Sequence, residues 1–273
     1  MTVSHQIDKI VREFARDSGR SLSIKSLSGP EIEITVRGDE SRPGASTLKV
    51  AISMEIARQL DNGLLSSSLL IKRKDLGTSI YPTLLEVLRE DHTFTIKELC
   101  GIMLATSDNL ISQYLLDLAG IQSVNSFLKD ISCRQSMIRV GYRDFELSPI
   151  GRANTTSTMD QIRLLTHLDQ ENTYSWIRNA MVNGLRKSRI ALRFPEDISI
   201  ANKTGSLNGV ANDVALISDR EIKIAIAVLT DRQTDAGRTG IEIADTVYAV
   251  WQTIGGRVHE LREEGTPSPD PHD

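Results

Sequence analysis

Residues 43–63, PGASTLKVAISMEIARQLDNG, decide how the rest of the chain is interpreted. After a break at its start, apolar residues recur at helical spacing without Pro or Gly until the closing Asn-Gly pair. This pattern predicts a helix over residues 46–60. Ser46 would begin that helix, where free N–H groups and the helix dipole favour negative charge. Lys49 follows one turn later on the same face and can serve as the general base for the hydroxyl. The alternative is that Ser46 only caps the helix and Lys49 points into solvent.

A second polar string separates two predicted helices. Residues 95–105 and 110–120 carry apolar helical patterns, and Ser-Asp-Asn at positions 107–109 stands between them. Polar side chains at such a break can reach inward. Ser107 is then a candidate to pass a proton to a leaving group, and Asn109 a candidate to hold the lysine of the first string or a substrate amide. An ordinary helix-to-helix turn is the alternative, since these residues suit one.

A third string lies on a predicted strand. Residues 198–206 alternate between apolar and polar, and Gly205 lets a ligand approach the backbone closely. Lys203 is expected to attract a carboxylate, and Thr204 and Ser206 to hydrogen-bond it. The N–H of Ser206 and that of the first-string serine are a candidate oxyanion hole. The alternative is an exposed lysine that protects the sheet edge.

The order of the strings S-x-x-K, S-D-N and K-T-G resembles the signature of serine β-lactamases and penicillin-binding proteins. Over roughly residues 5–258 the chain is most similar to class A β-lactamases. The resemblance implies an α/β (α+β) fold of the β-lactamase/transpeptidase type, with an antiparallel sheet flanked by helices and an all-helical subdomain. It implies one catalytic domain over residues 1–258, with the α/β part at 1–45 and 188–258 and the helical part at 46–187.

Local patterns agree with that division. Strand-like segments occur early, at residues 21–26 and 31–36, and late, at 221–229, and residues 247–258 are expected to close the domain as a helix. The polar, Pro-rich residues 259–273 are predicted to form a disordered tail.

Two features are interpreted through the resemblance alone. Arg189 falls where some relatives place the arginine that meets the substrate carboxylate. Class A enzymes release the acyl group with a glutamate in an E-x-x-L-N string, whereas this chain has Asp144 at the glutamate position and Ser148 at the asparagine. The shorter side chain places a water less well, and the loop is a few residues short, so Glu146 is the second candidate base.

The amino-acid composition limits the kinds of molecule that the protein is expected to bind. The chain has 273 residues, 40% of them hydrophobic, with a formal net charge of −4. It can therefore bury a sizeable core, and it lacks the basic excess typical of nucleic-acid binding. The five histidines show no ligand spacing, so neither a metal nor another cofactor is expected. The expected partner is a small molecule with an activated carbonyl and a carboxylate, bound by a monomer that does not associate with membranes.

Location is predicted from the first twenty residues and the cysteines. The N-terminal segment has no apolar core or cleavage site of a secretory signal, and it reads as an amphipathic helix. The resemblance places Cys100 at one half of a family disulfide, but Ser53 occupies the other position, and Cys133 lies far from it in sequence. Two thiols that need not pair suit a reducing cytoplasm. The alternative is an exported protein shown in processed form.

Together these features predict a serine hydrolase that acts through a covalent acyl-enzyme, with β-lactam amides as the expected substrates. Two alternatives stay open: a cytoplasmic esterase or transacylase of the same fold, and a penicillin-binding module with little turnover.

Overall fold

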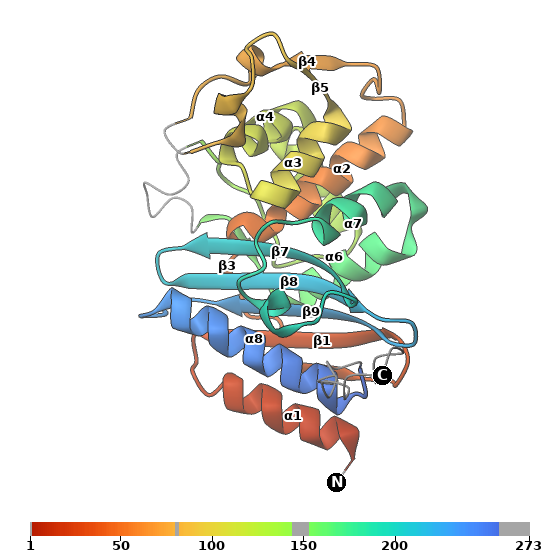
Figure 1. Ribbon diagram of the computed structural model, residues 1–273, viewed down its shortest axis with the longest axis vertical. Helices are drawn as coiled ribbons and strands as arrows, with labels where there is room; N and C mark the ends of the chain where they lie inside the picture. Colours follow the sequence, from red (N-terminus) through yellow and green to blue (C-terminus); the bar gives the residue numbers. More distant parts are fainter. Residues whose placement is uncertain (1, 80–81, 144–152, 257–273) are drawn as a thin grey trace, which may run out of the picture.

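The computed structural model describes residues 2–79, 82–143 and 153–256 and has two parts (Figure 1). One is a five-stranded antiparallel sheet in the order β2-β1-β9-β8-β7 with α1 and α8 on one face, and the other is a group of helices around α2. The helices are α1 (Val3–Phe14), α2 (Lys49–Asp61), α3 (Ile96–Thr106), α4 (Asn109–Ala119), α5 (Ile121–Asp130), α6 (Thr158–Gln170), α7 (Ser175–Val182) and α8 (Ala236–Thr253). The sheet strands are β1 (Arg20–Ser28), β2 (Glu33–Val36), β7 (Ser199–Leu207), β8 (Val210–Ser218) and β9 (Lys223–Thr230).

The sheet joins the two ends of the chain. Strand β1 pairs antiparallel with β9, with Ile24 opposite Ile226, and β8 pairs with both β9 and β7. Both faces of the sheet are covered, so its central strands are buried almost throughout. Helix α6 packs against β1 and β9 on the face that turns toward the helical part. This arrangement confirms the predicted fold class.

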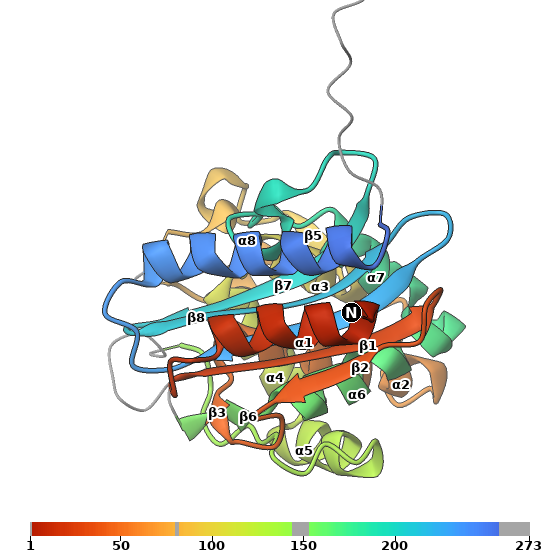
Figure 2. The ribbon, with the colours of Figure 1, turned by 90° about the horizontal axis from the view of Figure 1, so that it is seen from below.

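The opposite face of the sheet is covered by α1 and α8, which lie side by side across it (Figure 2). Helix α1 buries Ile7, Val11 and Phe14, and α8 buries Val247 and Trp251. Apolar residues three or four apart form one stripe on each helix, as an amphipathic helix on a sheet requires.

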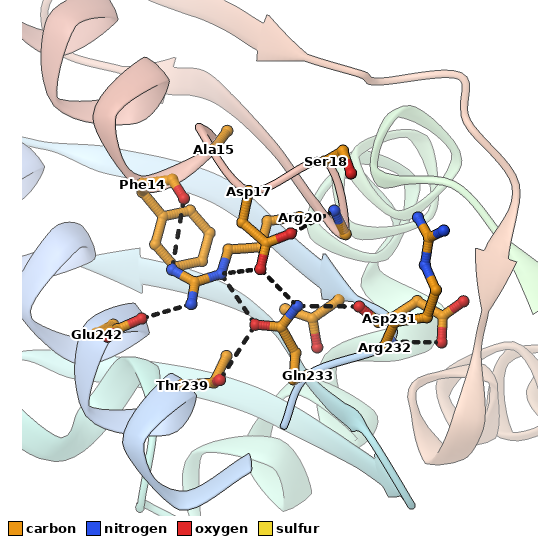
Figure 3. A network of polar contacts seen from close by, with 12 residues as sticks. Phe14, Ala15, Asp17, Ser18, Arg20, Asp231, Arg232, Gln233, Thr239 and Glu242 are labelled. Carbon is orange, nitrogen blue, oxygen red and sulfur yellow. Dashed lines mark hydrogen bonds and ion pairs between the residues drawn. The ribbon is translucent and has the colours of Figure 1, made fainter. Parts of the chain in front are cut away.

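A polar network ties this layer together (Figure 3). The Arg20 guanidinium lies 4.9 Å from the centroid of the Phe14 ring and forms a 2.6 Å ion pair with Glu242 on α8. Its Nε also donates to the side-chain carbonyl of Gln233 at 3.0 Å. One side chain of β1 therefore links α1, α8 and the loop before α8.

Three local predictions are corrected by the structure. The last helix begins at Ala236, capped by Asp235, and not at residue 247. The early glycines of this helix, Gly237 and Gly240, hid its start from the sequence pattern. Residues 46–187, expected to be helical, also contain the short antiparallel pair β4 (Leu70–Lys72) with β5 (Thr93–Thr95). They contain β6 (Thr155–Thr156) as well, which pairs antiparallel with β3 (Arg42–Pro43) just before this range. The helix predicted from residue 46 begins as a 3₁₀ turn, Ala45–Leu48, before α2.

The two cysteines are free and buried. Burial raises the pKa of the Cys100 thiol to about 12, and the Ser53 hydroxyl beside it lowers that pKa in part. Cys100 therefore faces the serine that the resemblance placed opposite it. Among the described residues, no helix combines the length and apolar character needed to cross a bilayer.

Candidate active site

Ser46 lies in a tight 3₁₀ turn at the start of α2 and is 8% exposed. The preceding residue, Ala45, has a φ of 48°, a left-handed conformation that costs a non-glycine residue free energy and recurs at active sites. The turn is held by a hydrogen bond from the Gly44 N–H to the Asn154 carbonyl at 2.8 Å, and by the Thr47 hydroxyl, which donates to the Gly44 carbonyl. The helix caps are Gly44 and Leu48, so Ser46 is not the N-cap of the alternative interpretation.

Strand β7 approaches this turn closely at Gly205. A Cβ there would lie 3.0 Å from the Cβ of Ala45 and 3.1 Å from the backbone N of Ser46, tighter than most Cβ contacts. Glycine lets the strand meet the backbone of Ser46 at this distance without displacing the turn. The approach supports the predicted oxyanion hole of Ser46 N–H and Ser206 N–H, which stays a prediction.

Lys49 is fully buried in the first turn of α2 and points toward the break between α3 and α4. Its Nζ donates to the Ser107 carbonyl and to Asn109 Oδ1, each at 2.7 Å, and lies 3.4 Å from the Ser107 Oγ. The Lys49 ammonium therefore does not point into solvent, as the alternative interpretation required. As predicted, Asn109 holds the lysine.

Hydrogen bonds hold the turn from Ser107 to Asn109 in place. Ser107 ends α3 in a left-handed conformation, with a φ of 65°. Asp108 caps α4 by accepting from the Ile111 N–H at 2.9 Å, and its other carboxylate oxygen accepts from the Thr83 hydroxyl. These bonds aim the Ser107 hydroxyl at the two lysines of the site, because Lys203 Nζ also donates to it at 2.9 Å.

Lys203 lies on the edge strand β7 but is only 2% exposed, so it is not an exposed edge lysine. Its ammonium also donates to the Thr204 carbonyl at 2.9 Å. Burial lowers the pKa of Lys203 to about 7, although the nearby Asp213 carboxylate raises it in part. Thr204 is buried at 5% exposure beside it on the same strand.

A carboxylate substrate should therefore be bound less well as pH rises. Lys203 carries its charge below a pKa of about 7 and loses it above. We expect kcat/KM for a substrate with a carboxylate to fall above pH 7 by up to about tenfold per pH unit, since this ratio reports groups of the free enzyme. An ester without a carboxylate should lack that alkaline limb. Lys187→Met removes a neighbouring half-buried ammonium and should leave the limb in place. A flat profile for the carboxylate substrate would contradict the role of Lys203.

Arg189 lies beside the predicted carboxylate-binding strand. Its guanidinium is 9% exposed and donates to the carbonyls of Gly205 and Asn212 and, at 2.6 Å, to the Ser206 Oγ. The arginine therefore links the end of β7 to β8. Its contact with a substrate carboxylate stays a prediction.

One buried charged residue near the site was not among those predicted from the sequence. Asp213 on β8 is fully buried opposite Thr204, and it accepts from the Ile190 N–H at 3.0 Å and from Asn202 Nδ2 at 3.1 Å. Burial raises the pKa of this carboxyl group, while Asn202 and Arg189 lower it. The sequence does carry a sign of this residue, because Asp213 is an acidic residue inside a predominantly apolar strand.

A cavity of about 320 Å³ opens beside these groups. Ser107, Asp108 and Asn109 line one wall, and Thr83 and Arg186 line others. Arg186 is exposed and its Nε donates to the Thr106 carbonyl at 3.1 Å. Arg186 therefore places a positive charge at the wall of this cavity.

Asp144 and Glu146, the two candidate deacylation bases, lie outside the described residues. The flanks of their segment are described. Gln113 Oε1 accepts from the Tyr142 N–H at 2.7 Å, and Asn154 Oδ1 accepts from the Arg139 N–H at 2.8 Å. Within the described ranges, no cluster of three or more His, Cys, Asp or Glu side chains could hold a metal ion.

Known proteins resemble this chain in sequence pattern and in fold. A sequence model of the beta-lactamase enzyme family matches residues 2–251. No curated protein sequence matches the chain. Among solved structures, the chain is similar to PBP-A (19% identity, 92% of this chain and 96% of that one, TM-score 0.80). It is also similar to a beta-lactamase from Sphaerobacter thermophilus (22% identity, 91% and 97%, TM-score 0.80) and to the TLA-3 extended-spectrum beta-lactamase (18% identity, 91% and 98%, TM-score 0.82).

Proposed function

Because this chain belongs to the beta-lactamase enzyme family, we propose that it is a class A-type serine hydrolase that opens β-lactam amides through a covalent acyl-enzyme. One observation carries the proposal. The Ser107 hydroxyl lies 2.9 Å from the Lys203 ammonium and 3.4 Å from the Lys49 ammonium, and Ser46 stands three residues before Lys49 in the 3₁₀ turn. These residues supply a nucleophile, a base and a proton relay, and the relay serine, Ser107, lines the cavity.

Acylation uses Ser46 and Lys49. The Ser46 Oγ forms a bond to the substrate carbonyl carbon, and its proton passes to the neutral Lys49 amine. Negative charge develops on the carbonyl oxygen, where the N–H groups of Ser46 and Ser206 would stabilise it. The close contact between Gly205 and the 3₁₀ turn supports this pairing.

Ring opening needs a proton on the leaving nitrogen. The Ser107 hydroxyl supplies it as the C–N bond breaks, and the lysines on either side return a proton to Ser107. Lys203, Thr204 and Ser206 hold the substrate carboxylate meanwhile. The buried ammonium of Lys203 gains from that contact because an opposite charge restores its protonated form.

Release of the acyl group separates the proposal from its alternatives. Asp144 is the proposed base that positions the hydrolytic water, with Glu146 as the second candidate. An esterase or transacylase in the cytoplasm, in which an amine or alcohol replaces water, is favoured by the aspartate at a glutamate position. A penicillin-binding module with little turnover is favoured by the similarity to PBP-A, a variant of which is solved as an acyl-enzyme complex with penicillin G.

Turnover of a chromogenic cephalosporin, followed by absorbance and intact mass, tests these functions. We expect many turnovers per enzyme molecule, and we expect Asp144→Asn to trap a stable acyl adduct while acylation continues at its former rate. Asp144→Glu should shorten the adduct's lifetime because the longer side chain places the water better. Trapping by Glu146→Gln instead would assign the base to Glu146.

Two outcomes would reject hydrolysis. Stoichiometric labelling of the unchanged enzyme without turnover would indicate a penicillin-binding module. An unchanged acyl-enzyme lifetime in Asp144→Asn, Asp144→Glu and Glu146→Gln would be the second such outcome. If added amines also speed release of the acyl group formed from an aryl ester, the protein would be a transacylase.

A further inference from the structure

The Lys49 ammonium is covered by an aromatic ring that the mechanism above does not use. Lys49 Nζ lies 4.9 Å from the centroid of the Tyr142 ring, and Tyr142 is fully buried. The same ammonium donates to the Ser107 carbonyl and to Asn109 Oδ1. A ring face within about 6 Å of a cation attracts it through the ring quadrupole.

Helix α4 builds this arrangement from two residues one turn apart. Asn109 holds the ammonium, and Gln113 accepts from the backbone N–H groups of Tyr142 at 2.7 Å and Arg143 at 3.2 Å. Side chains four residues apart lie on the same helix face. A Cβ on Gly141 would lie 2.1 Å from Gln113 Oε1, so a side chain there would displace the Gln113 amide from these two hydrogen bonds. The position of the Tyr142 ring is therefore part of the fold.

The ring acts on Lys49 as a neutral phenol. Burial raises the pKa of the Tyr142 hydroxyl above its ordinary value, so no phenolate forms in the working pH range. The ring face and the two carbonyl oxygens all favour the charged form of the lysine. A base must first lose that charge, so the ring opposes deprotonation.

Other charged groups also face Lys49. Lys203 approaches from β7 through the shared Ser107 hydroxyl, and Asp108 lies in the turn, where its carbonyl is 3.5 Å from Lys49 Nζ. Asp144 and Glu146 follow Tyr142 in the chain, outside the described residues. Any test of Tyr142 must hold these groups constant.

We propose that Tyr142 is a positioning residue that fixes the Lys49 ammonium and raises the pH at which Lys49 can accept the proton of Ser46. The proposal rests on the proposed function, in which Lys49 is the acylation base. It adds an element to the site that neither the three sequence strings nor the cavity contains.

The test is the pH dependence of the acylation rate constant, measured by stopped flow with a chromogenic cephalosporin. Tyr142→Leu keeps an apolar side chain but removes the ring face. The acid limb should move to lower pH by about one unit. Tyr142→Phe keeps the ring and should leave the limb nearly in place. Tyr174→Leu, a matched loss of a buried tyrosine away from Lys49, should not move it.

A set of fluorinated phenylalanines at position 142 separates the electrostatic effect of the ring from its packing. Phenylalanine with increasing fluorination at position 142 preserves shape while it weakens the negative ring face, so the acid limb should move stepwise to lower pH. An unmoved limb across this series would overturn the proposal, even if Tyr142→Leu fails to fold. The same holds if the shift appears equally in Tyr174→Leu.

Two further variants separate this proposal from the function it rests on. Acylation of Lys49→Met at the unchanged rate would remove Lys49 as the base, and the proposed mechanism would fail first. The Tyr142→Leu shift should persist in Asp144→Asn and Glu146→Gln backgrounds. Its disappearance there would assign the effect to those carboxylates and overturn the role of the ring.

Discussion

Ser46→Ala should abolish covalent labelling by β-lactams and fluorophosphonates and lower kcat by about a million-fold, the scale seen when a serine nucleophile is removed. The hydroxyl is the proposed atom that bonds to the substrate carbon, and alanine cannot replace it. The fold should persist, since Ser46 caps neither the 3₁₀ turn nor α2. Intact mass after incubation with each reagent checks the labelling, and thermal unfolding checks the fold.

Ser53→Ala is the matched control for this experiment. Ser53 is a buried serine of α2, the helix that follows the 3₁₀ turn of Ser46, and it lies beside Cys100. Its replacement should leave labelling intact. Full labelling of Ser46→Ala would show that another residue is the nucleophile and would remove the basis of the proposed function.

Lys49→Met should slow acylation by about 10²–10⁴-fold, the usual contribution of a positioned general base. Methionine fills similar space but cannot take the Ser46 proton. It also leaves the Ser107 carbonyl and Asn109 Oδ1 without the donor that each has at 2.7 Å. The acylation rate constant in single-turnover experiments checks the effect, and circular dichroism shows whether the fold is retained.

Lys187→Met controls for the loss of one positive charge near the site. The Lys187 ammonium donates to the carbonyls of Val182 and Ile200 and to Asn202 Oδ1, not to Ser107 or Asn109. Its acylation rate should stay within a few-fold of the unchanged enzyme. Equal losses in the two variants would attribute the effect of Lys49 to bulk electrostatics.

Much of the fold was predictable because its signals are local. Helical periodicity after the break at residue 43 and the polar interruption at 107–109 depend on neighbouring residues, so they are visible without tertiary contacts. The family signature then added the arrangement of sheet and helices, which the structure confirms. The start of α8 at Ala236 was missed because glycine weakens a helical pattern, and two glycines stand in the first turns of this helix.

The order of the three strings, their residue types and the fold class that they imply are all visible in the linear chain. The environment of each residue depends on the folded arrangement. Lys49 meets Ser107 across 58 positions and Lys203 meets it across 96. The lowered pKa of Lys203 and the ring of Tyr142 over Lys49 follow from these long-range contacts. Helix and turn formation depend on adjacent residues, whereas desolvation and charge depend on which distant segments exclude water from a side chain.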